Sequence, residues 1–117
     1  MITVLDYGAG NVRSVINAIE RLGETVNVTA DGKDVLKAEK LVFPGVGAFG
    51  SMMRILREKG LTDPLKTYLA SNKPFLGICL GMHALFEFSE ESGGTQGLGL
   101  FKGNVQRFTT SLAVPHI

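Results

Sequence analysis

The chain has 117 residues, 44% of them apolar, and a formal net charge of +1. This length suits one domain, and the composition excludes disordered and membrane-spanning classes. Acidic and basic residues are interspersed, so the sequence offers no basic stripe of the kind that binds nucleic acid. The single cysteine excludes an internal disulfide, and an N-terminus without an export signal favours a protein of the cytoplasm.

Strands and helices are expected to alternate, because the spacing of apolar residues switches repeatedly between the period of a strand (about 2 residues) and that of a helix (about 3.6 residues). The expected strands are residues 2–7, 25–29, 41–43, 75–78 and one or two within 98–108. The expected helices are residues 12–22, 49–59, 62–69 and 80–88, with Asn11 as the first N-cap and with Gly23 and Gly60 as stops. Residues 36–40 favour no element, and residues 89–97 predict a loop.

This order predicts an α/β fold with a mainly parallel sheet and helices on both faces. Folds of this kind place their sites beyond the carboxyl ends of the strands. Three glycine-bearing turns follow expected strands: DYGAGN, PGVGAFG and GICLGMH. Each is explained by turn chemistry alone, but together they predict one site at that edge of the sheet.

The stretch Gly77-Ile78-Cys79-Leu80-Gly81 has the spacing of a nucleophile elbow, a tight strand-to-helix turn that presents a reactive side chain. Glycines two residues before and after Cys79 suit such a turn, because larger side chains would crowd it. The helix N-terminus favours the thiolate, and the N–H of Leu80 is the natural first donor to an oxyanion. The competing interpretation is a buried cysteine that follows a core strand and is flanked by small residues for packing.

A cysteine nucleophile also requires a base, and the chain has two histidines. His83 follows Cys79 by four residues, so the two share a helix face, and His83 is either a base or a polar residue that lines the site. His116 is the second-last residue, which is a poor place for a catalytic base. The sequence therefore predicts a nucleophile without a convincing base.

The other two turns allow different interpretations. PGVGAFG offers a second oxyanion donor, from Val46 or Gly47, or is simply a turn that opens a helix. GAGNVRS resembles half of a dinucleotide fingerprint, with Asp31 where an acid would bind the ribose. Arg13 occupies the third glycine position of that fingerprint, so a nucleotide-binding module remains only a rival hypothesis.

Four stretches together resemble one known family: DYGAGN, LVFPGVGAFG, PFLGICLGMHALFEFSEES and GLGLFKGNVQRF. They resemble the class I (triad) glutamine amidotransferases, and more narrowly the glutaminase subunits of imidazole glycerol phosphate synthase. The resemblance runs through nearly all of the chain. It implies a flavodoxin-like α/β fold with no cofactor and no metal.

The resemblance also implies a reaction and a partner. The enzyme would hydrolyse glutamine to glutamate and ammonia through a cysteinyl thioester. The ammonia would pass to a (β/α)₈-barrel cyclase subunit in a heterodimer. That partner uses ammonia to build imidazole glycerol phosphate in histidine biosynthesis.

The matching motifs imply roles for individual residues. Cys79 resembles the nucleophile. The N–H of Leu80, with that of Val46 or Gly47, resembles the oxyanion hole. The positions expected to bind the substrate glutamine are Gly45, His83 and Glu91. The positions expected to face the cyclase are Asn11, Pro115 and His116, the last two in a stretch that resembles the start of the family motif PHxGWN.

The chain departs from the family pattern in two ways. His83 stands where the family usually has glutamine, and an imidazole also donates and accepts hydrogen bonds, but with a different reach. The family's catalytic His and Glu lie in a late FHPE-type motif that is absent here. We therefore expect residues 1–117 to be the N-terminal part of one domain, inactive alone, with an uncovered sheet edge and apolar surface. The alternative is a non-catalytic subunit that docks a partner through the Asn11 face.

Overall fold

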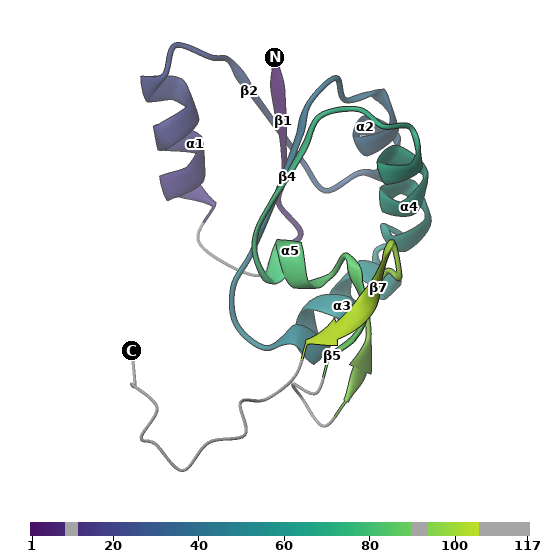
Figure 1. The fold of residues 1–117 in the computed structure, drawn as a ribbon. Coiled ribbons are helices and arrows are strands. Elements are labelled where there is room, and N and C mark those ends of the chain that lie inside the picture. The colour runs from purple at the N-terminus through teal and green to yellow at the C-terminus, as the bar shows by residue number, and fades with distance from the viewer. Residues whose placement is uncertain (9–11, 90–93, 106–117) are drawn as a thin grey trace.

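The computed structural model describes residues 1–8, 12–89 and 94–105. Its main sheet has four parallel strands in the order β2-β1-β3-β4 (Figure 1). The strands are β1 (Ile2–Leu5), β2 (Val26–Thr29), β3 (Leu41–Gly45) and β4 (Phe75–Cys79). All four were expected from the sequence to within two residues at each end, and the parallel α/β fold is confirmed.

Helices cover both faces of this sheet, as expected. They are α1 (Arg13–Arg21), α2 (Gly32–Lys37), α3 (Phe49–Glu58), α4 (Thr62–Ala70) and the four-residue α5 (Leu80–His83). Figure 1 shows α1 on one side of the sheet and α2 and α4 on the other. Both expected glycine stops are confirmed, because Gly23 and Gly60 follow α1 and α3 with φ of 90° and 66°.

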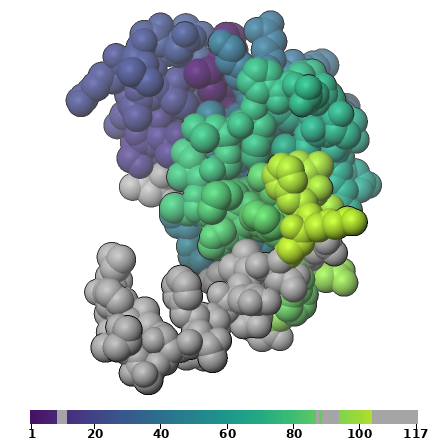
Figure 2. All heavy atoms as spheres, in the orientation of Figure 1, coloured from purple at the N-terminus to yellow at the C-terminus, as the bar shows by residue number. Residues whose placement is uncertain are grey.

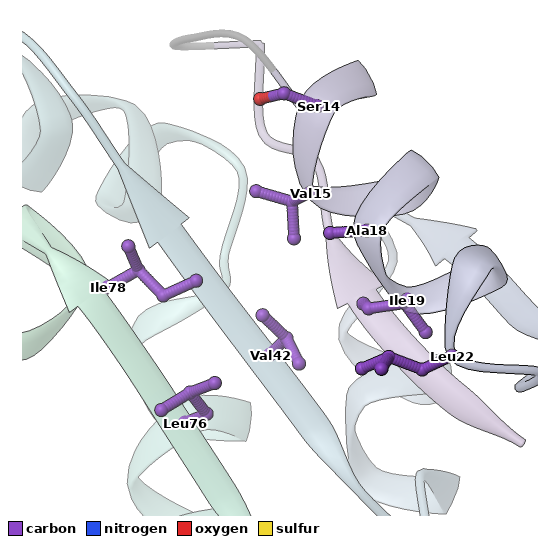
Figure 3. Close-up of a pocket in the computed structure, with 8 residues that line it drawn as sticks. All are labelled: Ser14, Val15, Ala18, Ile19, Leu22, Val42, Leu76 and Ile78. Atoms are coloured by element: carbon purple, nitrogen blue, oxygen red, sulfur yellow. The ribbon is translucent and has the colours of Figure 1, made fainter.

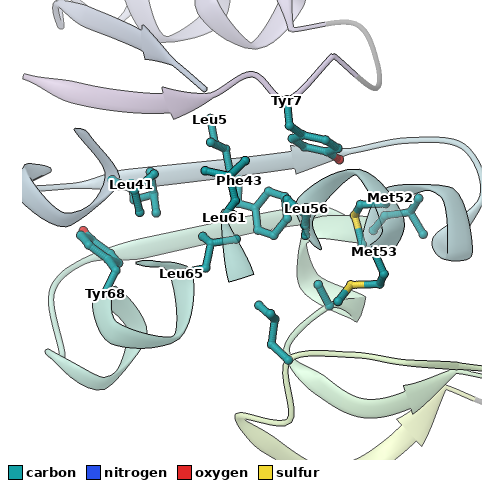
Figure 4. Close-up of a cluster of buried hydrophobic side chains, with 14 of the residues drawn as sticks. Leu5, Tyr7, Leu41, Phe43, Met52, Met53, Leu56, Leu61, Leu65 and Tyr68 are labelled. Atoms are coloured by element: carbon teal, nitrogen blue, oxygen red, sulfur yellow. The ribbon is translucent and has the colours of Figure 1, made fainter. Parts of the chain in front are cut away.

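Alternating strand residues divide the core between the two faces. Leu5, Leu41 and Phe43 pack against α2, α3 and α4 in the larger cluster (Figure 4). Val4 and Val42 point the other way and pack against Ile19 of α1. Because the side chains of a strand alternate with a period of two, one short strand serves both layers.

The start of α1 and the whole of α2 differ from the sequence prediction. Val12 occupies the N-cap of α1, and Asn11 lies outside the described residues. Helix α2 forms over residues for which no element was expected, because Asp31 caps it by accepting a hydrogen bond of 2.8 Å from the N–H of Lys33. This cap also accounts for Asp31, which the nucleotide-binding hypothesis had used as a ribose ligand.

The helix expected over residues 80–88 is wrong beyond His83. The chain turns there into β5 (Phe86–Ser89), which lies between β6 (Thr95–Gln96) and β7 (Phe101–Val105) in a small second sheet. The alternation in Phe-Glu-Phe-Ser suits a strand, and the rings of Phe86 and Phe101 pair across the sheet with centroids 6.1 Å apart. Strand β6 falls in the expected loop, and β7 falls within the expected strand region.

An apolar groove lies on the α1 face of the main sheet (Figure 3). Its volume is about 340 Å³, and α1, β3 and β4 line it with Ser14, Val15, Ala18, Ile19, Leu22, Val42, Leu76 and Ile78. Leu22 is 83% exposed and Leu76 is 57% exposed. Strand β4 is also an edge of the sheet. An open edge and uncovered apolar surface were both expected for an incomplete domain.

Candidate active site

Cys79 lies at the turn between β4 and α5, with φ of 54° and ψ of −117°. A non-glycine residue with positive φ is strained, and a strained strand-to-helix turn is what a nucleophile elbow requires. Its side chain is exposed, which overturns the alternative of a buried packing cysteine. In Figure 2 the green atoms of the β4 and α5 region lie at the surface of the molecule.

The two flanking glycines are required by close packing at this turn. A Cβ on Gly77 would lie 2.9 Å from the backbone carbon and oxygen of Gly81. A Cβ on Gly81 would lie 1.9 Å from the carbonyl oxygen of Phe43 in β3. Contacts this short with backbone atoms leave no space for a side chain. The spacing in the sequence thus reflects a real steric limit on both sides of Cys79.

Strand β3 brings the second glycine turn next to Cys79. Gly45, the last residue of β3, is the register partner of Cys79 in β4. Val46 and Gly47 therefore continue from a point beside the thiol, and Gly47 has φ of 94°. The first residues of a helix also have no partner within it for their N–H groups, which applies to Leu80 in α5. The expected oxyanion donors thus come from the two segments that meet at the elbow.

His83 ends the same short helix that begins after Cys79. Its Nδ1 is buried and has no hydrogen-bond partner among the described residues, and none of their hydrogen bonds joins its ring to the thiol. The structure therefore gives no support to His83 as the base. The other expected site residues, Glu91, Asn11, Pro115 and His116, lie outside the described residues.

Tyr7, two residues after the end of β1, is a neighbour of the site that the sequence did not single out. It is 2% exposed, and its ring meets that of Phe43 edge-on with centroids 5.6 Å apart (Figure 4). A Cβ on Gly45 would lie 2.8 Å from its hydroxyl oxygen. Burial raises the pKa of Tyr7 to about 12, and the nearby Asp6 carboxylate adds to this. The only signal in the sequence was its place at a strand end.

Within the described residues, no helix is both long and apolar enough to cross a membrane. The same residues contain no group of three or more His, Cys, Asp or Glu side chains placed to hold a metal ion. The chemistry available at the carboxyl edge of the sheet is therefore that of an exposed thiol at a strand-to-helix turn.

Comparison with protein families agrees with this chemistry. The family described as Glutamine amidotransferase class-I matches residues 3–111, so the chain belongs to the class I glutamine amidotransferases. The fold is also similar to a crystal structure of a glutamine amidotransferase, with a TM-score of 0.75 and 23% identity. That match covers 91% of this chain and 56% of the other.

Individual relatives within this family are also similar to the chain. The chain is 49% identical over 122 residues to imidazole glycerol phosphate synthase subunit HisH of Sulfurimonas denitrificans, a match that covers all of this chain and 59% of the relative. It is 48% identical over 119 residues to the chloroplastic imidazole glycerol phosphate synthase hisHF of Arabidopsis thaliana, again over all of this chain but 20% of the relative. The chain thus spans less than two thirds of the length of either relative.

Proposed function

We propose that this chain belongs to a glutaminase subunit that supplies ammonia to a cyclase partner for imidazole glycerol phosphate synthesis in histidine biosynthesis. The observation that carries the proposal is the strained, exposed Cys79 at the β4–α5 turn. The relatives named as imidazole glycerol phosphate synthase support the choice of pathway. The substrate is glutamine, and the partner is a (β/α)₈-barrel cyclase.

The reaction proceeds through a covalent intermediate on Cys79. The thiolate attacks the side-chain amide carbon of glutamine, and the resulting oxyanion accepts hydrogen bonds from the N–H of Leu80 and that of Val46 or Gly47. The C–N bond then breaks, and the nitrogen takes up a proton and leaves as ammonia. Water hydrolyses the remaining thioester, which releases glutamate and restores the thiol. Gly45, His83 and Glu91 bind the substrate.

We also propose that residues 1–117 form the N-terminal part of a single amidotransferase domain. The HisH relative is much longer than the matched segment, which covers 59% of it. The groove between α1 and β4 is an apolar surface, and the edge of β4 exposes backbone hydrogen-bonding groups; further chain commonly covers surfaces of both kinds. The base that moves protons during turnover belongs to that remaining part of the domain, and Asn11, Pro115 and His116 face the cyclase.

A non-catalytic docking subunit is the second candidate. The unpaired Nδ1 of His83 and the absence of a hydrogen bond to the thiol favour it, because within the described residues Cys79 has no bonded base. This candidate requires an inert thiol and a stable complex with the cyclase. It therefore differs from the glutaminase in one measurable property, the reactivity of Cys79.

The test is glutamine hydrolysis by two proteins: this 117-residue chain and the natural-length protein, each assayed with and without the cyclase. We expect ammonia release only from the natural-length protein, and faster release in the complex. Steady turnover by the 117-residue chain would contradict the proposal of an incomplete domain. No turnover by the natural-length protein in the complex, with the complex intact, would favour the docking subunit.

A further inference from the structure

The Tyr7 hydroxyl is a buried polar group that makes no hydrogen bond within the described residues. The side chain is 2% exposed, and its hydroxyl oxygen has no hydrogen-bond partner within the described part of the chain. Buried polar groups are nearly always hydrogen-bonded, and an unpaired one weakens the fold. Phenylalanine would fill the same apolar space without this cost. The retained hydroxyl therefore calls for a role other than packing.

The hydroxyl lies at the junction of the two segments that form the candidate site. The position that a Gly45 Cβ would take is 2.8 Å from this hydroxyl and 3.0 Å from the backbone nitrogen of Gly81 in α5. It is also 3.0 Å from Cβ of Leu80. The space in which a Gly45 side chain would lie is therefore bounded by both the tyrosine hydroxyl and the first turn of α5.

The surroundings also keep this hydroxyl in one chemical state. Burial and the Asp6 carboxylate raise the pKa of Tyr7 to about 12, so the group stays neutral and keeps its proton at every pH at which a glutaminase would be assayed. A neutral hydroxyl exerts a constant steric and dipolar effect on the space beside Gly45.

We propose that Tyr7 is a positioning residue of the glutaminase site, whose hydroxyl sets the distance between the end of β3 and the first turn of α5. Val46 and Gly47 follow Gly45 directly, so the placement of Gly45 decides where their N–H groups point relative to Cys79. Oxyanion donors stabilise a transition state only when their geometry is held before the reaction. The inference rests on the proposed glutaminase function.

Tyr68 provides a matched control on the far side of the core. It is 1% exposed, but its hydroxyl donates a hydrogen bond of 2.6 Å to the carbonyl of Pro74, at the start of β4 and away from the elbow. The Tyr7→Phe variant loses an unpaired hydroxyl. The Tyr68→Phe variant loses a bonded one, and the Pro74 carbonyl keeps only its hydrogen bond from the N–H of Leu41. The two changes are chemically identical and should have opposite consequences.

The experiment measures kcat, KM and Tm of the natural-length protein in complex with the cyclase. For Tyr7→Phe we expect kcat to fall about tenfold or more with KM within about twofold, because the affected interaction forms in the transition state. Its Tm should be unchanged or higher. For Tyr68→Phe we expect a lower Tm and an unchanged kcat. A Tyr7→Phe variant with the kcat of the parent protein would overturn the inference.

A second measurement is independent of turnover. The rate of Cys79 alkylation by iodoacetamide is compared among the parent protein, Tyr7→Phe and Tyr68→Phe. We expect the rate to change severalfold only in Tyr7→Phe, whether or not glutamine is hydrolysed. Equal rates in all three proteins would overturn the coupling between Tyr7 and the elbow. An inactive parent protein whose alkylation still depends on Tyr7 would instead locate the failure in the proposed glutaminase function.

Discussion

Replacement of Cys79 by serine is expected to abolish glutamine hydrolysis by the natural-length protein. Cys79 is the only cysteine of the 117 residues, and the turn between β4 and α5 presents its side chain to solvent. Loss of a covalent nucleophile lowers kcat by about 10⁴-fold or more in enzymes of comparable design. Serine keeps the size and the backbone preference nearly unchanged, so the fold should persist. Ammonia release in a coupled assay measures the effect.

The matched control for this variant is Thr67→Ala, an exposed position on α4. It should retain the parent rate, and both variants should keep the parent Tm within a few degrees. A Cys79→Ser protein that is folded and hydrolyses glutamine within tenfold of the parent would contradict Cys79 as the nucleophile.

Replacement of Gly81 by alanine is expected to cost about 3 kcal/mol or more of the free energy of unfolding. The new Cβ would lie 1.9 Å from the carbonyl oxygen of Phe43, which belongs to the buried strand β3. Alanine is the better helix former, so local propensity alone would stabilise the variant. Any loss must therefore come from displacement of α5 against β3. Urea denaturation of parent and variant gives the difference.

The Gly23→Ala variant is the control, because it introduces backbone strain without a steric clash. Gly23 has φ of 90° and no atom within 4 Å of its added Cβ, so its replacement should cost only about 1 kcal/mol. Similar losses for Gly81→Ala and Gly23→Ala would show that α5 and β3 leave room for a side chain at Gly81.

The main sheet was predictable because the residues that end its strands and helices are easy to recognise in the sequence. Glycine and proline bound β3 and β4, and Gly23 and Gly60 follow helices with the positive φ that favours glycine. The prediction failed where the same stretch of sequence suits both a helix and a strand. Residues 80–88 contain apolar side chains at helical spacing, but Phe86 belongs to a strand pair whose partner, Phe101, lies in another element. The spacing of apolar residues within one stretch does not show which distant strand that stretch will pair with.

The candidate site was predictable in part. The glycines around Cys79 indicated the elbow, and the Cβ positions of Gly77 and Gly81 now supply the physical cause. Tyr7 was missed because an aromatic residue at a strand end has no distinctive spacing, and its proximity to Gly45 exists only after β1 and β3 pair. The roles expected of His83 and Gly45 in substrate binding stay predictions.

The most direct test of the central claim is the mass of the natural-length protein after incubation with a chloroketone analogue of glutamine. The account predicts one covalent adduct per chain, located on the peptide that contains Cys79, and protection by excess glutamine. An unmodified Cys79 in a protein that still releases ammonia from glutamine would contradict the claim that this elbow carries the reaction.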